Sequence, residues 1–292
     1  MSDYRIDALP SSFFNPKPYK FGLTLSGGGA KCMAQIGMLQ YLDEQGVKPD
    51  VISGASGGAL VGALYAAGHS PENILSFFID SQMFKASNFS FNKLGLINSE
   101  KLNRHFHGWL KRDNFDALEI PLFVAATDLN TAQQVVFHEG ELIQPLLASA
   151  AYPGMFTPVK IGDKLFADGG ITNNYPTDLI HEQCRAHLGM YLSPLEHKAN
   201  HEFSDAFDVL DRVFEIYSSA HLLKSIKLPD ISLAPEGIDQ WGAFNVNNDS
   251  LNTMFTLGYE TTRDYFEGEG AEWLQELKKD LSKKSFLDNL TG

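Results

Sequence analysis

Hydrophobic residues along this chain fall alternately into short apolar runs and longer segments with helical spacing. Apolar runs at residues 21–25 and 51–53 predict strands, and segments 31–45 and 59–67 predict helices that end at Gly46 and Gly68. The apolar residues of the first helix are predicted to share one face: Met33, Ile36, Leu39 and Leu42. This order of strand, helix, strand and helix is typical of a largely parallel sheet covered by helices.

The same two patterns recur, with interruptions, in the rest of the chain. A β segment is predicted at residues 134–138, paired as a hairpin, and further apolar runs predict strands at 122–127, 164–167, 188–192 and 230–233. Residues 72–111 have mixed helical and loop character and are rich in Phe. Helical spacing is clearer at residues 142–151, 203–223 and 272–290.

The segments group into one α/β unit with additions at its ends. We expect an extended lead-in at residues 1–18, a single catalytic α/β domain at 19–270 and an amphipathic C-terminal helix at 271–292. The helix is predicted to turn four side chains inward: Leu274, Leu277, Leu281 and Phe286.

Composition narrows the classes of function. The 292 residues carry a formal net charge of −13, and nucleic-acid binding depends on Lys and Arg that neutralise phosphates, so no nucleic acid is an expected partner. The acidity also disfavours strong electrostatic capture by an anionic bilayer. The two cysteines, Cys32 and Cys184, are too few for a disulfide framework.

The N-terminal residues and the hydropathy of the chain bear on its location. No basic segment followed by an apolar one opens the sequence, and no apolar run reaches the ~18 residues that a membrane helix needs. We therefore expect a cytoplasmic protein, with secretion by a route that needs no such signal as the alternative. A lipid substrate would be met from the aqueous side.

The strongest local motif is GASGG at residues 54–58, between a predicted strand and a predicted helix. It fits the GxSxG nucleophile elbow, in which a serine occupies a tight strand-to-helix turn. Gly54 and Gly58 would remove the side chains that collide in such a turn. Ser56 would then project near the helix N-terminus, where free N–H groups suit a developing negative charge. The alternative is a glycine-rich turn with an incidental serine.

A second glycine-rich turn, SGGGAK at residues 26–31, also joins a strand to a helix. Gly27, Gly28 and Gly29 would expose backbone N–H groups that could form an oxyanion hole. A dinucleotide fingerprint is the rival interpretation, but its third glycine position holds Cys32. A plain tight turn is the remaining alternative.

Asp168 precedes two glycines at the end of a predicted strand. Such a segment is usually a turn, but a serine nucleophile needs a base, and a partly buried carboxylate can serve as one. None of the nine histidines lies in a glycine-rich or sharply patterned segment, although several follow Asp168 in the chain. No metal-binding motif such as HExxH or CxxC is present.

Together, the glycine loop, the GxSxG elbow and the later DGG resemble the patatin-like phospholipase family. ASAAYPGMFTPV at residues 148–159 is similar to the family segment A-S-x-A-x-P-x-x-F-x-P, and DGGITNNYP at 168–176 to D-G-G-x-x-x-N-x-P. DISLAP and the later LGYE resemble the closing strand and helix of bacterial members. The resemblance extends over residues 20–266.

The resemblance implies a three-layer α/β/α sandwich with a mainly parallel central sheet. It also implies hydrolysis of carboxylic esters in phospholipids, lysophospholipids or related acyl lipids. Ser56 would attack the acyl carbonyl, Asp168 would take its proton and later activate water, and the N–H groups of Gly27, Gly28 and Gly29 would stabilise the oxyanion. No metal or organic cofactor is implied. The expected partners are the acyl lipid and, transiently, a membrane surface; no oligomeric state is predicted.

Two features leave alternatives open. Cys32 stands where the family usually has glycine. We expect its side chain only to pack against its neighbours, and sensitivity of the enzyme to thiol reagents is the rival hypothesis. The Phe-rich stretch is expected to be core, with an acyl-binding wall or lid as its alternative: Phe77, Phe78, Phe84, Phe89 and Phe91.

The proposed lipid hydrolase has two rivals. One is a general carboxylesterase or thioesterase with the same residues but no preference for lipids. The other is a noncatalytic regulatory protein on the same fold, which the intact motifs disfavour.

Overall fold

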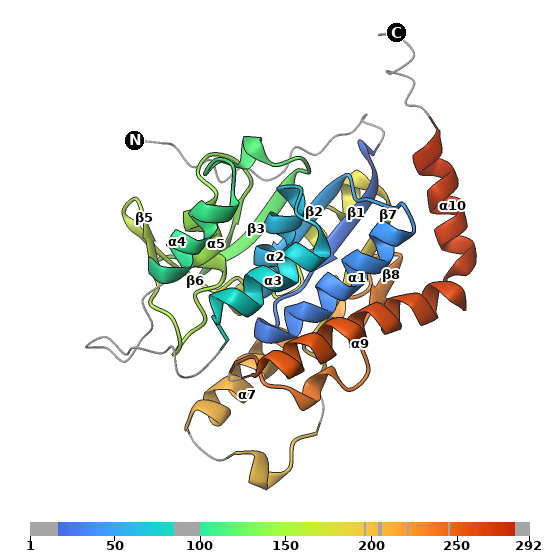
Figure 1. Cartoon of the computed structure of the whole chain (residues 1–292). Coiled ribbons are helices and arrows are strands. Elements are labelled where there is room, and N and C mark those ends of the chain that lie inside the picture. The colour runs from blue at the N-terminus through green and yellow to red at the C-terminus, as the bar shows by residue number, and fades with distance from the viewer. Residues whose placement is uncertain are drawn as a thin grey trace.

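A twisted sheet forms the centre of the molecule, which we describe from a computed structural model (Figure 1). The structure describes residues 17–84, 100–195, 197–203, 206–220, 222–244 and 246–283. Within these residues the strands follow the order β5-β6-β3-β2-β1-β7-β8, and β4 pairs with β3. The strands are β1 Tyr19–Leu25, β2 Val51–Ala55, β3 Leu122–Asp128, β4 Gln133–Phe137, β5 Val159–Ile161, β6 Lys164–Ala167, β7 Cys184–Met190 and β8 Ile231–Leu233.

The direction of the strands confirms the predicted α/β class. The five neighbours β3, β2, β1, β7 and β8 are parallel, whereas β4, β5 and β6 form antiparallel pairings at one side of the sheet. The predicted hairpin is therefore present as β3 and β4. A parallel strand that is buried on both faces has an almost continuous run of apolar residues, and such runs allowed these strands to be predicted from the sequence.

Helices flank this mainly parallel sheet, as expected (Figure 1). Their bounds are α1 Met33–Glu44, α2 Ser56–Ala66, α3 Pro71–Ser81, α4 Glu100–Trp109, α5 Ile143–Ser149, α6 Gly170–Asn173, α7 Ala206–Ser219, α8 Leu222–Ser225, α9 Asn248–Glu267 and α10 Ala271–Ser282. A short 3-10 turn, Gly29–Cys32, precedes α1. Among the described residues, no helix is both long and apolar enough to cross a membrane.

Helix α1 is buried around most of its circumference, so the prediction of one apolar face was too narrow. Ala34, Gln35 and Met38 are buried in addition to the predicted set. The reason is α9, which lies along α1 and covers the side that faces away from the sheet (Figure 1). A Cβ on Gly258 would collide with the carbonyl of Ala34, so glycine allows the two backbones to approach.

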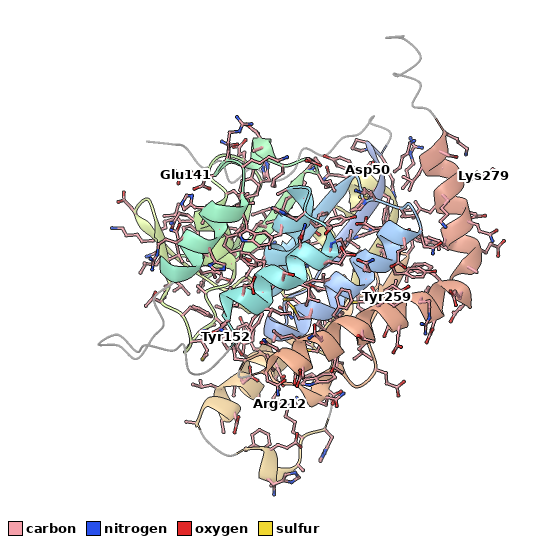
Figure 2. All side chains as sticks on the ribbon, in the orientation of Figure 1. Asp50, Glu141, Tyr152, Arg212, Tyr259 and Lys279 are labelled. Atoms are coloured by element: carbon pink, nitrogen blue, oxygen red, sulfur yellow. The ribbon has the colours of Figure 1, made fainter. Side chains whose placement is uncertain are left out.

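Other boundaries differ modestly from the predictions. Strand β7 begins at Cys184, earlier than expected, and the helix predicted at residues 203–223 is divided into α7 and α8. In the tail, Leu274 and Leu277 of α10 are buried, and Lys279 lies on its outer side (Figure 2). Phe286 and most of the lead-in lie outside the described residues, and the division into domains stays a prediction.

The Phe-rich stretch belongs to the core in its described part. Phe77 and Phe78 are completely buried on α3, and Phe84 is nearly so. The three rings contact one another or their neighbours in edge or stacked arrangements. The core interpretation is therefore confirmed for these three, whereas Phe89 and Phe91 lie outside the described residues.

The close contact between α1 and α9 gives a prediction for stability. Gly258→Ala should destabilise the protein by about 1–3 kcal/mol, because the added methyl group overlaps the Ala34 carbonyl. The matched control is Gly108→Ala on α4, where no atom lies within 4 Å of the new Cβ. That change should stabilise by about 0.5–1 kcal/mol through helix propensity. Urea unfolding measures both, and equal effects of the two substitutions would contradict the packing argument.

Candidate active site

Ser56 lies at the sharp junction between β2 and α2. Its φ of 49° is in the left-handed region, which non-glycine residues rarely adopt. A Cβ on Gly54 would lie 2.8 Å from the amide nitrogen of Ala59, and one on Gly58 would collide with the Leu25 carbonyl. Both glycines are therefore required by close backbone approach, and the turn has the geometry of a nucleophile elbow.

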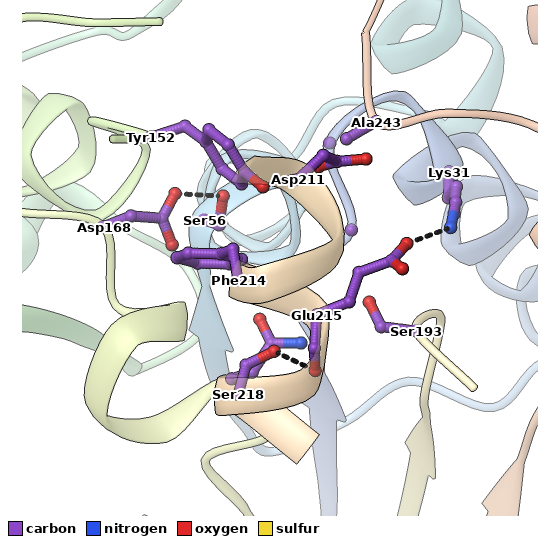
Figure 3. A pocket seen from close by; sticks show the side chains of 13 residues that line it. Lys31, Ser56, Tyr152, Asp168, Ser193, Asp211, Phe214, Glu215, Ser218 and Ala243 are labelled. Carbon is purple, nitrogen blue, oxygen red and sulfur yellow. Dashed lines mark hydrogen bonds and ion pairs between the residues drawn. The ribbon is translucent and has the colours of Figure 1, made fainter. Parts of the chain in front are cut away.

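The hydroxyl of Ser56 faces the carboxylate of Asp168, which directly follows β6. Ser56 Oγ donates a hydrogen bond to Asp168 Oδ2 at 2.7 Å. The other carboxylate oxygen accepts the N–H of Gly170 at 2.7 Å. Tyr152 and Phe214 lie on either side of the Ser56–Asp168 pair (Figure 3). The structure thus joins two residues that are 112 positions apart in the sequence.

Two hydroxyl groups hold the backbone of this pair in place. The N–H of Ser56 donates to Ser149 Oγ at 2.9 Å, and Ser149 Oγ donates to the carbonyl of Ala125 at 2.6 Å. Thr127 Oγ1 donates to the Asp168 carbonyl at 2.8 Å. These contacts from β3 and α5 stabilise the strained turn and the position of the carboxylate. Ser149 belongs to the family-like segment ASAAYPGMFTPV, but neither its contact with Ser56 nor the role of Thr127 was predicted from the sequence.

Burial changes the acidity of Asp168. The side chain is fully buried, and this burial raises its pKa to about 7, against the opposing effect of the hydrogen bonds from Ser56 and Gly170. A carboxylate with this pKa can accept a proton and return it near neutral pH. Asp168 therefore has the properties of a general base that is matched to a serine hydroxyl.

The glycine-rich loop reaches the same site, but its three glycines differ. Gly28 and Gly29 line the cavity beside Ser56, and neither N–H donates to another residue in the part of the chain that the structure describes. The N–H of Gly27 instead donates to the Asn174 carbonyl at 2.9 Å. Of the three loop glycines, Gly28 and Gly29 therefore keep N–H groups without a partner among the described residues, and these are the candidates for binding an oxyanion. The side chain of Asn174, in the family-like NYP segment, also lines the cavity.

No histidine lines this cavity among the described residues. His187 lies in the sheet, where its Nε2 is 2.8 Å from Thr24 Oγ1. Burial, with a smaller effect of nearby His181, lowers the pKa of His187 to about 3, so the ring is neutral. Its role is structural, in agreement with the choice of a carboxylate as the candidate base.

Cys32 is completely buried at the end of the 3-10 turn that follows the glycine loop. A Cβ on Gly57 would lie 3.1 Å from its sulfur, so the thiol packs against the nucleophile elbow. Burial raises the pKa of Cys32 and disfavours the reactive thiolate. The packing role is supported, because the side chain has no exposure to solvent.

Helix α7 covers the serine and the carboxylate, which the sequence analysis did not foresee. Four of its residues line the cavity: Asp211, Phe214, Glu215 and Ser218 (Figure 3). The remaining cavity is about 30 Å³, enough for one or two water molecules but not for an acyl chain. Helical spacing predicted a helix at residues 203–223, but not the surface against which it packs.

Comparisons with known proteins match the chain to one family model and to several relatives. The model of the family described as patatin-like phospholipase matches residues 23–181. An uncharacterised NTE family protein of Mycobacterium tuberculosis is 32% identical over 159 residues, which are 54% of this chain and 44% of that protein. Neuropathy target esterase sws of Drosophila melanogaster is 28% identical over 176 residues, 57% of this chain and 12% of that protein.

A viral relative and a solved structure match more of the chain. An uncharacterised protein of Acanthamoeba polyphaga mimivirus is 25% identical over 273 residues, 84% of this chain and 89% of that protein. The crystal structure of VipD from Legionella pneumophila has 15% identity and a TM-score of 0.50, and covers 86% of this chain and 67% of that one. The match to VipD supports the fold. The chain spans less than half the length of the mycobacterial and fly relatives.

The raised pKa of Asp168 suits a catalytic base but should lower the stability of the folded protein at neutral pH. A buried carboxyl whose pKa is raised to about 7 binds its proton more tightly in the folded state than in the unfolded state. Stability is therefore lost between about pH 4 and pH 7, by on the order of 4 kcal/mol. Asp168→Asn should remove this loss, so the variant should be more stable than the wild type at pH 8 in urea unfolding, with a smaller difference at pH 4.5.

Asp128 is the control, because its pKa is shifted in the opposite direction. It is also buried, but hydrogen bonds from Lys164 and from the N–H groups of Asn130 and Thr131 outweigh desolvation and lower its pKa. Its charge stabilises the fold above the unfolded pKa, so Asp128→Asn should be less stable than the wild type at pH 8. If wild type and Asp168→Asn lost stability in parallel between pH 4.5 and 8, the raised pKa would be wrong.

Proposed function

This chain belongs to the patatin-like phospholipase family, which consists of lipid acyl hydrolases, and on that premise we propose that it cleaves carboxylic esters of acyl lipids with Ser56 and Asp168. The substrates we propose are phospholipids, lysophospholipids or related lipids. The observation that carries the proposal is the 2.7 Å hydrogen bond between the serine hydroxyl and a buried carboxylate whose pKa lies near 7. A relative that is named an esterase supports the same class of reaction.

The first half of the proposed reaction forms an acyl-enzyme. Ser56 Oγ attacks the acyl carbonyl carbon while Asp168 takes the hydroxyl proton. The carbonyl oxygen becomes negative, and the N–H groups of Gly28 and Gly29, which line the cavity, would stabilise it. When the tetrahedral intermediate collapses, the bond to the alcohol breaks, and Asp168 returns the proton to the departing oxygen.

The second half releases the fatty acid. Asp168, again ionised, takes a proton from a water molecule that attacks the acyl carbon. The same N–H groups stabilise the second tetrahedral intermediate, and Ser56 leaves with the proton from Asp168. One carboxylate thus acts as base and acid in turn, which its pKa near 7 allows.

Replacement of Ser56 tests the nucleophile. Ser56→Ala should lower the release of fatty acid by at least ~10⁴-fold, because the acyl-enzyme can no longer form. The assay should use purified protein with phospholipid, lysophospholipid and a short-chain activated ester. A fluorophosphonate probe should label the wild type and the control Ser76→Ala, whose serine is on the outside of α3, but not Ser56→Ala.

The same panel separates the rival enzyme class. A rate that rises with acyl chain length on lipids supports a lipid hydrolase, whereas the best rate on short soluble esters supports a general esterase. Activity that persists undiminished in purified Ser56→Ala would contradict the assignment of the nucleophile.

The pH dependence of the rate tests the base. Because Asp168 must be ionised to accept the proton, kcat/KM on a soluble ester should rise about tenfold per pH unit below pH 7 and level off above it. The midpoint should barely move with temperature, as for a carboxyl group, whereas a histidine base would shift it clearly. A rate that is already at its plateau at pH 5 would contradict a base with this pKa.

A further inference from the structure

Helix α7 has its polar and apolar sides reversed relative to an ordinary surface helix. Asp211, Glu215 and Ser218 point inward to the cavity, together with the aromatic side chain of Phe214. The opposite side is apolar and lies in water, with five side chains at helical spacing that are about half exposed or more: Val209, Leu210, Val213, Ile216 and Tyr217. A helix in contact with its own core normally buries the apolar side and exposes the polar one.

This reversed helix covers the candidate active site and leaves little space beside Ser56. Phe214 packs against Tyr152 with ring centroids 4.5 Å apart, and both lie beside Ser56 and Asp168 (Figure 3). Because the cavity is only about 30 Å³, an acyl lipid cannot reach Ser56 while α7 stays in this position. Substrate entry therefore requires α7 to move away from the serine.

The inner side of α7 is held mainly by polar contacts. Tyr152 Oη donates to Asp211 at 2.6 Å, and Glu215 pairs with Lys31 at 3.8 Å and with Lys198 at 3.1 Å. Tyr152 and Arg212 mark the end of the molecule that α7 covers (Figure 2). Polar groups of this kind can be rehydrated when a helix moves, whereas an apolar inner side would oppose the movement.

We propose that the apolar stripe Val209, Leu210, Val213, Ile216 and Tyr217 docks on a zwitterionic lipid surface, and that docking draws α7 away from Ser56. This inference rests on the proposed lipid hydrolysis. A helix with one apolar side can lie in the boundary between head groups and acyl chains, where the stripe leaves water. The surface that holds the substrate then also supplies the free energy that opens the site.

The charge of the chain and the side chains of the stripe favour a zwitterionic lipid surface as its partner. The stripe itself carries no charged residue, so its contribution to binding is apolar burial. A net charge of −13 disfavours an anionic bilayer, which leaves zwitterionic or neutral lipid as the better surface. An exposed tyrosine, here Tyr217, has an apolar ring and a polar tip, which suit the interface between water and lipid.

The test is a pair of matched double variants. Val213→Ser/Ile216→Ser changes side chains that are 57% and 51% exposed and do not line the cavity. Leu129→Ser/Leu165→Ser is the control, because it removes side chains of similar exposure, 46% and 41%, from other elements. Flotation with dioleoylphosphatidylcholine vesicles measures binding. The α7 variant should bind on the order of 30-fold more weakly than the wild type, and the control should bind as the wild type does.

Enzyme assays extend the same comparison. On a short-chain phosphatidylcholine, the wild-type rate should rise steeply at the concentration where monomers form micelles, and the α7 variant should lose this rise. Its rate on a monomeric activated ester should stay close to the wild-type rate, because Ser56 and Asp168 are untouched. Equal vesicle binding by both double variants, or a retained rise at micelle formation, would overturn the proposal.

Two further results separate this inference from its rivals. If light scattering shows a wild-type dimer that the α7 double variant turns into a monomer, with vesicle binding unchanged, a second copy of the chain is the partner and the lipid surface is wrong. Ser56→Ala should keep vesicle binding and lose all turnover. A wild type that binds vesicles but hydrolyses no ester would contradict the proposed function, whereas one that hydrolyses esters but binds no vesicle would contradict only the docking.

Discussion

The hydrogen bond between Ser56 and Asp168 is the contact on which the rest of the site depends. It joins a serine with a φ of 49° to a carboxylate without exposure to solvent, and both conditions are unfavourable by themselves. Neighbouring groups hold them in place: Ser149 accepts the N–H of the strained serine, and Gly170 donates to the second carboxylate oxygen. The surroundings of the pair therefore maintain an arrangement that an isolated turn would not keep.

The sheet explains how distant residues meet at this contact. Strands β1 and β2 are parallel neighbours, so the glycine loop that follows β1 and the serine that follows β2 emerge at the same edge. Asp168 follows β6, which pairs with the end of β3 at Thr127, and the Thr127 hydroxyl binds the Asp168 carbonyl. Gly169 allows this approach, because a Cβ there would collide with the carbonyl of Ala125. The sheet thus brings nucleophile, carboxylate and backbone donors together.

The sequence predicted the parts of this arrangement that depend on local chemistry. Glycines beside Ser56 and Asp168 are required by crowding between backbone atoms, so they form motifs that can be read without a structure. Contacts over long distances left no such motif. The segment that contains Ser149 was recognised, but its hydrogen bond to the N–H of Ser56 was not, because the two residues are far apart in the sequence. The hydrogen bond from the Gly27 N–H to the Asn174 carbonyl likewise depends on how two loops meet.

The orientation of helix α7 could not be predicted from the sequence, for a different reason. Periodicity locates an apolar side but does not say whether that side meets the core, a partner or water. In α1 the helix α9 buries residues outside the predicted face, whereas in α7 the apolar side lies in solvent and the polar side is turned inward. Periodicity predicted both helices, but which of their sides are buried depends on tertiary contacts.

The reversed sides of α7 also bear on the chemistry of Asp168. Its pKa is raised by burial, and α7 contributes to that burial by placing Phe214 beside the carboxylate. If the helix moved away in water, solvent would reach the carboxylate, and its pKa would fall toward the ordinary value for aspartate. If the helix moves away on a lipid surface, as proposed, an acyl chain beside the carboxylate would keep water out. Opening toward lipid would therefore preserve the raised pKa of Asp168, whereas opening toward water would lower it, and the movement that admits the substrate would favour catalysis only where a lipid is present.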